Sequence, residues 1–473
     1  MHIPRFMIAA VKSGSGKTVL TMAMLEALRQ RGVSLRCCKC GPDYIDPMFH
    51  REILGLSSRN LDTFFTSPQL TREIFLSGRQ DGDLVVMEGV MGLYDGLGGT
   101  RPEGSSYDLA KITGTPVILV LNARGMSRSA LAVLRGFVDY DSDHLIRGFI
   151  LNEITRTSYD RLKPLIEEEL NIPVLGYMPH REELAMGRRH LGLLRPSEIR
   201  DLKENAALAA QSLESSVDVD RILKIAESAP PFEESPSVLF PAGLPRPDKA
   251  VFGSGPAADE PVIAVARDPA FCFYYEENLM LLRYYGARIV EFSPLYDKKL
   301  PDNISGLILG GGYPELSSFQ LNANESMRSA VREAVLGGMP TLAECGGFLY
   351  LQESIDGKQM TSVLPGQSRG TGRLVRFGYV NITAKEGEDT FLRAGETIRG
   401  HEFHYYDSTD NGNACTAVKP VTGASWDCMV NTPTMLAGFA HLYYPSFPEL
   451  ARRFVEKAGQ YRAKCIAAKE EFV

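Results

Sequence analysis

Near the start of the sequence, a glycine-rich segment carries the side chains needed to bind a nucleoside triphosphate. Residues 12–18 (KSGSGKT) follow an apolar run and precede a stretch with helical periodicity. In a strand–loop–helix unit of this kind, backbone N–H groups surround phosphate oxygens, a lysine neutralises them and a hydroxyl binds Mg²⁺. Lys17 and Thr18 fit the last two roles, although Val11 replaces the first glycine of a strict phosphate-binding loop. The candidate ATP-binding residues of the loop are Lys12, Ser13, Gly14, Ser15, Gly16, Lys17 and Thr18.

Acidic side chains follow the next two apolar runs of the first half. Asp43 and Asp46 come shortly after the run 35–39. Glu88 ends the following run, and Asp95 lies in the loop behind it. Because open parallel sheets bind ligands at the carboxyl ends of their strands, we expect these carboxylates near the triphosphate. There they could bind Mg²⁺, which prefers oxygen ligands and needs few from protein, or act as a base; turn and cap roles are the alternative.

The second half of the sequence contains a cysteine in a nucleophile-like context. A strand that ends in a small residue leads through Glu344 to Cys345, which precedes two glycines and an apolar helix. A sharp strand-to-helix turn would expose the thiolate beside helix N–H groups, which lower its pKa and can stabilise an oxyanion. The glycine turn 310–312 could complete that oxyanion hole, and His441 is our candidate base. The candidate oxyanion-hole residues are Gly311, Gly312 and Gly346.

The composition of the chain limits the class of protein in which these two sets of residues could act. The chain has 473 residues, 44% of them hydrophobic and 23% charged, which is typical of a folded protein of two or three domains. A net charge of −7 with mixed signs gives no footprint for nucleic acid, and no apolar run reaches the roughly 20 residues of a membrane helix. With no signal peptide evident, we expect a cytoplasmic protein whose eight cysteines are thiols. An ATP site joined to a cysteine nucleophile suggests ATP-driven amide formation with nitrogen from glutamine.

Apolar runs that alternate with helical stretches predict an α/β fold in two domains. Strands of a mostly parallel sheet are expected at 6–11, 35–39, 84–88, 117–121, 148–152 and 174–178. After a Pro-rich linker, strands of a second sheet are expected at 262–266, 289–292, 306–309 and 341–343. We expect antiparallel strands from 361–406 to be added to this second sheet. The predicted boundaries are 1–228 for an ATP-dependent amidoligase domain, 229–260 for the linker and 261–473 for a glutamine amidotransferase domain.

Two of the acidic segments resemble the cobyrinic acid a,c-diamide synthase family. They are residues 39–47 (KCGPDYIDP) and 87–96 (MEGVMGLYDG). Further matches to the family lie at 58–62, 174–177 and 189–193. The resemblance implies a dethiobiotin-synthetase-like phosphate-loop domain with helices on both faces of its sheet. It also implies that ATP phosphorylates a side-chain carboxylate of a corrin precursor and that ammonia then displaces the phosphate.

Roles for individual residues follow from this resemblance. Lys12, Lys17 and Thr18 correspond to residues that bind ATP and Mg²⁺ in the family, and Asn152 corresponds to an asparagine that contacts adenine. The resemblance implies metal ligands at Thr18, Asp43 and Glu88. It implies substrate binding or activation by Lys39, Asp43, Tyr44, Asp46 and Asp95. The expected cofactors are ATP and Mg²⁺, and the expected substrates are cobyrinic acid, L-glutamine and ATP, with a homodimer possible.

The elbow at Cys345 and the glycine turn resemble class I glutamine amidotransferases. This resemblance implies that Cys345 attacks the glutamine amide to form a thioester, while His441 gives a proton to the departing ammonia. Tyr443 stands where many relatives have a glutamate that orients the histidine, so we expect a Cys–His dyad. His401 and His404 compete with His441 for the role of base. A place near the domain interface is expected for this pair in preference to a zinc site.

Other assignments remain open from the sequence. The same motifs occur in hydrogenobyrinate and nickel-sirohydrochlorin a,c-diamide synthases, which separate poorly from the cobyrinate enzyme. Cobyric acid synthase is disfavoured by the pair Asp43 and Asp46. A nucleotide-switched partitioning-type ATPase would account for Lys12 but would have no use for Cys345.

Overall fold

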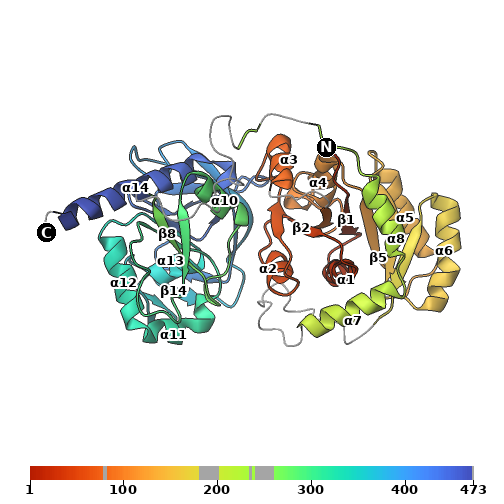
Figure 1. The fold of residues 1–473 in the computed structure, drawn as a ribbon, viewed down its shortest axis with the longest axis horizontal. Coiled ribbons are helices and arrows are strands. Elements are labelled where there is room, and N and C mark those ends of the chain that lie inside the picture. The colour runs from red at the N-terminus through yellow and green to blue at the C-terminus, as the bar shows by residue number, and fades with distance from the viewer. Residues whose placement is uncertain (78–82, 181–201, 234–236, 240–259, 471–473) are drawn as a thin grey trace. The chain divides into compact units, whose positions relative to one another are not determined.

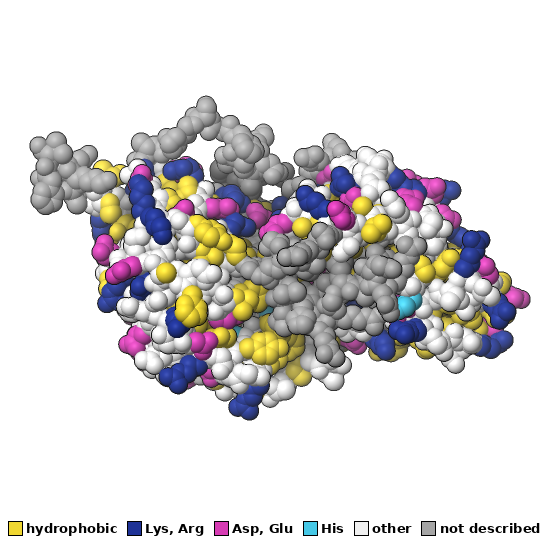
Figure 2. Space-filling model, turned by 90° about the horizontal axis from the view of Figure 1, so that it is seen from below, with side chains coloured by type: hydrophobic (Ala, Val, Ile, Leu, Met, Phe, Trp, Pro, Cys, Tyr) yellow, Lys and Arg dark blue, Asp and Glu magenta, His cyan; other side chains and the backbone are white. Residues whose placement is uncertain are grey.

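Two compact units make up the computed structural model, which describes residues 1–77, 83–180, 202–233, 237–239 and 260–470 (Figure 1). The first unit is Met1–Pro241 and the second is Ala242–Val473. Most of the predicted linker, and the family match at 189–193, lie outside the described residues. No described helix is long and apolar enough to cross a bilayer. Acidic and basic side chains intermingle on the face shown in Figure 2.

A seven-stranded parallel sheet with the order β3-β2-β4-β1-β5-β6-β7 forms the centre of the first unit. Its strands are β1 Arg5–Ala10, β2 Leu35–Cys40, β3 Ser58–Leu61, β4 Leu84–Glu88, β5 Val117–Asn122, β6 Ile146–Asn152 and β7 Val174–Met178. Strands β1, β2 and β4 are buried throughout, as expected for strands covered on both faces. The parallel sheet predicted from the apolar runs is therefore present, with β3 as an additional edge strand.

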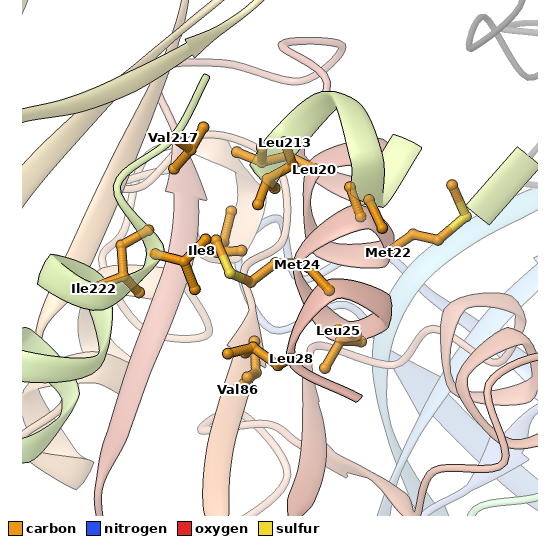
Figure 3. Packing of buried hydrophobic residues seen from close by; sticks show 14 of the residues in the cluster. Ile8, Leu20, Met22, Met24, Leu25, Leu28, Val86, Leu213, Val217 and Ile222 are labelled. Carbon is orange, nitrogen blue, oxygen red and sulfur yellow. The ribbon is translucent and has the colours of Figure 1, made fainter. Parts of the chain in front are cut away.

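Helices cover this sheet and pack against its apolar side chains. The α-helices among the described residues of this unit are α1 Lys17–Gln30, α2 Ile45–Glu52, α3 Pro68–Leu76, α4 Ser106–Thr113, α5 Ser129–Tyr140, α6 Arg156–Leu170, α7 Leu202–Glu214 and α8 Val219–Glu227. Leu20, Met24 and Leu28 recur every four residues along α1 and are buried, so they form one face of the helix. Figure 3 shows them packed with Ile8 of β1 and Leu213 of α7. This packing fixes the start of α1 at the end of β1.

The second unit contains a six-stranded sheet with the order β20-β21-β11-β10-β8-β9. Its strands are β8 Val262–Ala266, β9 Arg288–Phe292, β10 Gly306–Leu309, β11 Thr341–Glu344, β20 Val430–Asn431 and β21 Met435–Gly438. Only the β20–β21 pair within this sheet is antiparallel. The α-helices among the described residues of the unit are α10 Glu276–Tyr284, α11 Ser318–Ala323, α12 Glu325–Leu336, α13 Gly346–Leu351 and α14 Glu449–Glu470.

Mostly antiparallel strands of the second unit form two further sheets, and the expectation that they extend the six-stranded sheet was wrong. One sheet has the order β13-β12-β14-β17 and the other the order β19-β18-β15-β16-β22. Their strands are β12 Ser354–Ile355, β13 Lys358–Gln359, β14 Gln367–Gly370, β15 Arg376–Ala384, β16 Thr397–His404, β17 Tyr406–Ser408, β18 Cys415–Val418, β19 Ser425–Cys428 and β22 His441–Leu442. Burial alternates along the second half of β15, as expected for a strand with one covered and one more open face.

Candidate functional site

The phosphate loop lies between β1 and α1 with glycines at its two sharpest positions. Gly14 has φ +75° and Gly16 has φ +91°, a left-handed conformation that L side chains rarely adopt. A Cβ on Gly16 would lie 2.2 Å from Asn152 Nδ2. That amide donates a hydrogen bond to the Ser15 carbonyl at 2.8 Å. Asn152, at the carboxyl end of β6, therefore contacts the loop and fixes its shape.

Lysines occupy different environments in this loop. Lys12 is exposed, whereas Lys17 is buried at the start of α1. The Lys17 ammonium donates a hydrogen bond to the carbonyl of Met91, which has a left-handed backbone with φ +50°. Burial, followed by the positive charge of Lys39, lowers the pKa of Lys17 to about 8. A bound phosphate would raise the pKa of Lys17 again, because its negative charge favours the charged ammonium.

Side chains from β2, β4 and α1 meet beside the loop. Lys39 on β2 and Glu88 on β4 are partners in register, and Lys39 Nζ lies 3.0 Å from Glu88 Oε1. The Thr18 hydroxyl donates to the same Oε1 at 2.8 Å. Lys39 also pairs with Asp46 and lies 3.6 Å from Asp43 Oδ2. The structure thus brings together five of the predicted residues, namely Thr18, Lys39, Asp43, Asp46 and Glu88.

The pKa values of Glu88 and Asp46 are shifted in opposite directions. Burial opposes the charge of Glu88, but Lys39, His50 and Thr18 together outweigh it and lower the pKa of Glu88. Burial, followed by the charges of Asp43 and Glu88, raises the pKa of Asp46 well above its ordinary value. Burial alone would favour neutral Lys39, but the carboxylates raise its pKa well above the usual range. Glu88 is therefore the carboxylate that keeps its negative charge, and Asp46 is more ready than Glu88 to hold a proton.

The remaining predicted residues of the first unit lie around the cluster. Asp43 Oδ1 accepts a hydrogen bond from the backbone of Ile45 at 2.8 Å and so caps the start of α2. Tyr44 is buried at the same helix start. Asp95 lies in a separate turn, where its Oδ2 accepts from the Gly92 N–H at 2.9 Å. His50, which sequence analysis did not select, contacts the cluster from α2 through Glu88 at 3.6 Å.

The donor set of the cluster fits a magnesium ion held together with a nucleotide. Among the described residues, no group of three or more His, Cys, Asp or Glu side chains is arranged to hold a metal by itself. Mg²⁺ does not require such a cage, because it keeps waters and phosphate oxygens and takes one or two protein ligands. The Thr18 hydroxyl and Glu88 Oε1, which are 2.8 Å apart, are oxygen donors beside the phosphate loop. A Mg²⁺ ion would neutralise the phosphate charge there.

Cys345 forms a strained elbow between β11 and α13 in the second unit. Its φ of 47° and ψ of −103° lie outside the regions that non-glycine residues normally adopt. Its N–H donates to the Gly438 carbonyl at 2.8 Å, which fixes the elbow to β21. A Cβ on Gly347 would lie 2.0 Å from the Leu309 carbonyl, so the helix can begin this close to β10 only with glycine. This is the nucleophile-elbow geometry expected from the sequence.

The expected lowering of the Cys345 pKa is wrong for this structure. The thiol is 8% exposed, and burial, followed by the negative charge of Glu315, raises its pKa. The Gly346 amide acts in the opposite direction but does not outweigh them. A helix start therefore does not suffice to ionise a thiol that packing has removed from water. A nucleophilic role of Cys345 would therefore require a base that takes this proton.

His441 lies on β22, in contact with the glycine turn. A Cβ on Gly311 would lie 2.3 Å from His441 Cε1, and a Cβ on Gly346 would lie 3.2 Å from the Gly312 nitrogen. The turn, the elbow and the histidine therefore share one small region. Burial, with a smaller contribution from His404, lowers the pKa of His441 to about 3. His441 is thus neutral near pH 7 and able to accept a proton.

The two competing histidines do not converge on one point. His401 is the cross-strand partner of His441, and the rings of Phe377 and Tyr379 meet it edge-on. His404 is three residues further along β16 and faces the opposite side of the sheet. There it stacks on Phe439 with 4.1 Å between ring centroids. The pair therefore does not form a two-histidine metal site.

Comparison with known proteins covers both units. The CobQ/CobB/MinD/ParA nucleotide binding domain matches residues 6–193, and the CobB/CobQ-like glutamine amidotransferase domain matches residues 262–447. The chain is 38% identical to the cobyrinate a,c-diamide synthase of Dehalococcoides mccartyi, over 98% of this chain and 100% of that protein. It is 36% identical to the enzyme of the same name from Priestia megaterium, over 99% and 98% of the two chains. For the Salmonella typhimurium enzyme the identity is 37%, over 96% and 98%.

Proposed function

The chain belongs to the cobyrinate a,c-diamide synthase family, and from this premise we propose how its two units divide the work. It is an ATP-dependent carbon–nitrogen ligase of cobalamin biosynthesis that amidates cobyrinate with nitrogen from glutamine. The proposal assigns carboxylate activation to the cluster of Thr18, Lys39, Asp43, Asp46 and Glu88, and ammonia release to Cys345 and His441. Its main support is that each unit gathers a complete set of groups for one of these reactions.

In the first unit, the phosphate loop binds ATP and Asn152 contributes to the nucleotide site. Thr18 and Glu88, with Asp43 beside them, would hold Mg²⁺. Bound Mg²⁺ and ATP supply an electrophilic phosphoryl group that converts a side-chain carboxylate into an acyl phosphate. Lys39, with Tyr44 and Asp95 in the surrounding loops, orients the substrate carboxylate. Asp46, whose pKa is raised, accepts a proton from the ammonia that replaces the phosphate.

In the second unit, neutral His441 takes the proton of the Cys345 thiol. The thiolate forms a bond to the amide carbon of glutamine, and N–H groups of Gly311, Gly312 and Gly346 stabilise the resulting oxyanion. His441 returns the proton to the leaving nitrogen as the carbon–nitrogen bond breaks, so ammonia departs and a thioester remains. Water then cleaves the thioester to glutamate and restores the thiol. Tyr443 replaces the usual orienting glutamate, so the catalytic pair is a dyad.

Paired variants test this division of labour. Cys345→Ala should abolish glutamine-dependent synthesis and keep ammonia-dependent synthesis within about twofold, because the ATP site is untouched. Asp46→Asn should lower synthesis from either nitrogen source by about 10²-fold and leave glutamine hydrolysis unchanged. Cys465→Ala, which alters an exposed cysteine of the same unit, is the matched control. Loss of both activities in a folded Cys345→Ala protein would contradict the proposal.

Four finer points belong to the same proposal. The relatives carry the cobyrinate name, which favours cobyrinate over hydrogenobyrinate or nickel-sirohydrochlorin as the substrate. Mg²⁺ is proposed as the working cation. A homodimer and a cytoplasmic location are proposed as well, and light scattering of the purified chain tests the first of them. The partitioning-type ATPase is set aside because the relatives match both halves of the chain.

A further inference from the structure

His50 is a buried histidine that none of the roles above uses. It lies on α2, one helical turn after Asp46, so the two side chains share a face of the helix. His50 is 2% exposed and Asp46 is 7% exposed. Buried polar groups persist when they have partners that compensate the loss of water. The surroundings of the imidazole therefore indicate what it is for.

The two ring nitrogens of His50 face different partners. Nδ1 lies 3.0 Å from the Ser58 hydroxyl on β3. Nε2 lies 3.6 Å from Glu88 Oε2 and 3.8 Å from Cys37 Sγ. Because a carboxylate oxygen only accepts, this arrangement assigns the ring hydrogen to Nε2 and leaves Nδ1 to accept from Ser58. Ser58 thereby orients the imidazole toward Glu88.

Glu88 is held from two sides. Its Oε1 accepts from Thr18 at 2.8 Å and from Lys39 at 3.0 Å. Its Oε2 has no partner within hydrogen-bond distance among the described residues, and the His50 Nε2 group is the polar group that faces it. Glu88 itself is fully buried, so an Oε2 facing only apolar groups would destabilise the charge. Without His50, Oε2 would lose the polar group that faces it and, with it, one restraint on the orientation of the carboxylate.

We propose that His50 is a positioning residue that fixes Glu88 with Oε1 directed to the Thr18 hydroxyl, and so supports the binding of the divalent cation with ATP. This inference rests on the proposed role of Glu88 as a metal ligand. Groups that orient a ligating carboxylate commonly change metal affinity by 10–100-fold when they are removed. The effect of His50 should therefore appear in cation binding and leave glutamine hydrolysis in the second unit unchanged.

Equilibrium binding of Mn²⁺ tests the proposal with the full chain. Free Mn²⁺ is counted by electron paramagnetic resonance in the presence of a non-hydrolysable ATP analogue. His50→Leu should weaken Mn²⁺ binding at least about 10-fold, whereas His50→Gln, which keeps an N–H donor, should retain most of it. Cys37→Ala is the matched control, because it removes another neighbour of the same imidazole and leaves the His50 ring in place. Glutamine hydrolysis should be the same in all of these proteins.

The outcomes separate this inference from the proposed function. Glu88→Gln with unchanged Mn²⁺ binding would overturn the assignment of Glu88 as a ligand. Weakened binding in Glu88→Gln together with unchanged binding in His50→Leu would overturn only the role of His50. If His50→Leu does not fold, Ser58→Ala decides: weaker Mn²⁺ binding supports the orientation of the ring by Ser58, and unchanged binding contradicts it.

Discussion

Replacing Gly311 by alanine is a sharp steric test of the glutaminase site. The backbone of Gly311 is not in the left-handed region, so an added methyl group introduces no φ strain. Its Cβ would lie 2.3 Å from His441 Cε1 and 3.1 Å from Nδ1. His441 is 3% exposed, and its ring is not the far end of a flexible chain. The substitution should therefore displace the imidazole with little other change.

The size of the displacement sets the expected effect. Ordinary contact begins at 3.4 Å, so the ring must retreat by about 1.1 Å from the 2.3 Å contact. A misplacement of about 1 Å can lower a rate by roughly 10²-fold, because proton transfer depends on the reacting atoms being close and aligned. We expect Gly311→Ala to lower the kcat of glutamine hydrolysis by about 10²-fold. Ammonia-dependent synthesis should stay within about twofold.

Two assays, one for each activity, measure the effect. Glutamate release reports on the second unit, and amide formation from ammonium chloride reports on the first. Gly459→Ala is the matched control, because it makes the same change in α14 of the same unit with no atom within 4 Å of the new Cβ. Glutamine hydrolysis within threefold of the parent in Gly311→Ala would refute the placement of His441 against the glycine turn.

Three further predictions concern the ATP site, the divalent cation and a buried carboxyl group of the second unit. Gly16→Ala should raise the Kd of ATP at least about 10-fold, because its Cβ would lie 2.2 Å from Asn152 Nδ2 at a φ of +91°; Gly136→Ala, with open space around it, should leave equilibrium ATP binding unchanged. Removing divalent cations with a chelator should abolish ammonia-dependent synthesis but not glutamate release, and equal loss of both would place the cation elsewhere. Burial raises the pKa of Glu344 from 4.5 to about 8, and the hydrogen bond from Tyr444 only partly opposes it. The folded protein then holds a proton that the unfolded chain loses between those values, so stability falls as pH rises from about 4.5 to 8, by at most ~4 kcal/mol. Urea unfolding at pH 5 and pH 8 should show this loss of unfolding free energy in the parent and a smaller loss in Glu344→Gln. An equal loss in the two proteins would contradict the prediction.

Most of the first sheet was predictable because its strands are buried on both faces and appear as apolar runs. Strand β3 was missed because its sequence, Ser58–Leu61, is largely polar. Its side chains serve the neighbouring loops: the Asn60 amide donates to the carbonyls of Gly41 and Asp43. In the second unit, a segment rich in Thr, Val, Tyr and Gly predicted antiparallel strands, but composition does not specify which sheet they join. That choice depends on tertiary packing, which no local pattern records.

The candidate sites, too, were predictable only in part. The gathering of Asp43, Asp46 and Glu88 followed from the rule that the carboxyl ends of parallel strands meet at one edge of the sheet. The place of His50 beside Glu88 was not predictable, because a lone histidine in a helix has no distinguishing pattern until β3 and β4 are placed beside it. The direction of the Cys345 pKa was mispredicted because burial of the thiol is a property of the packed fold. The individual catalytic roles stay predictions until the variants are measured.

The most direct test of the central claim is mass spectrometry of cobyrinic acid after incubation with the purified chain, Mg²⁺, ATP and amide-¹⁵N glutamine. The account predicts a product with two new amides, both carrying ¹⁵N, and no product when ATP is omitted. Unchanged cobyrinic acid, while ATP and glutamine are consumed, would contradict the substrate assignment. Amides without the label would contradict the transfer of nitrogen from glutamine.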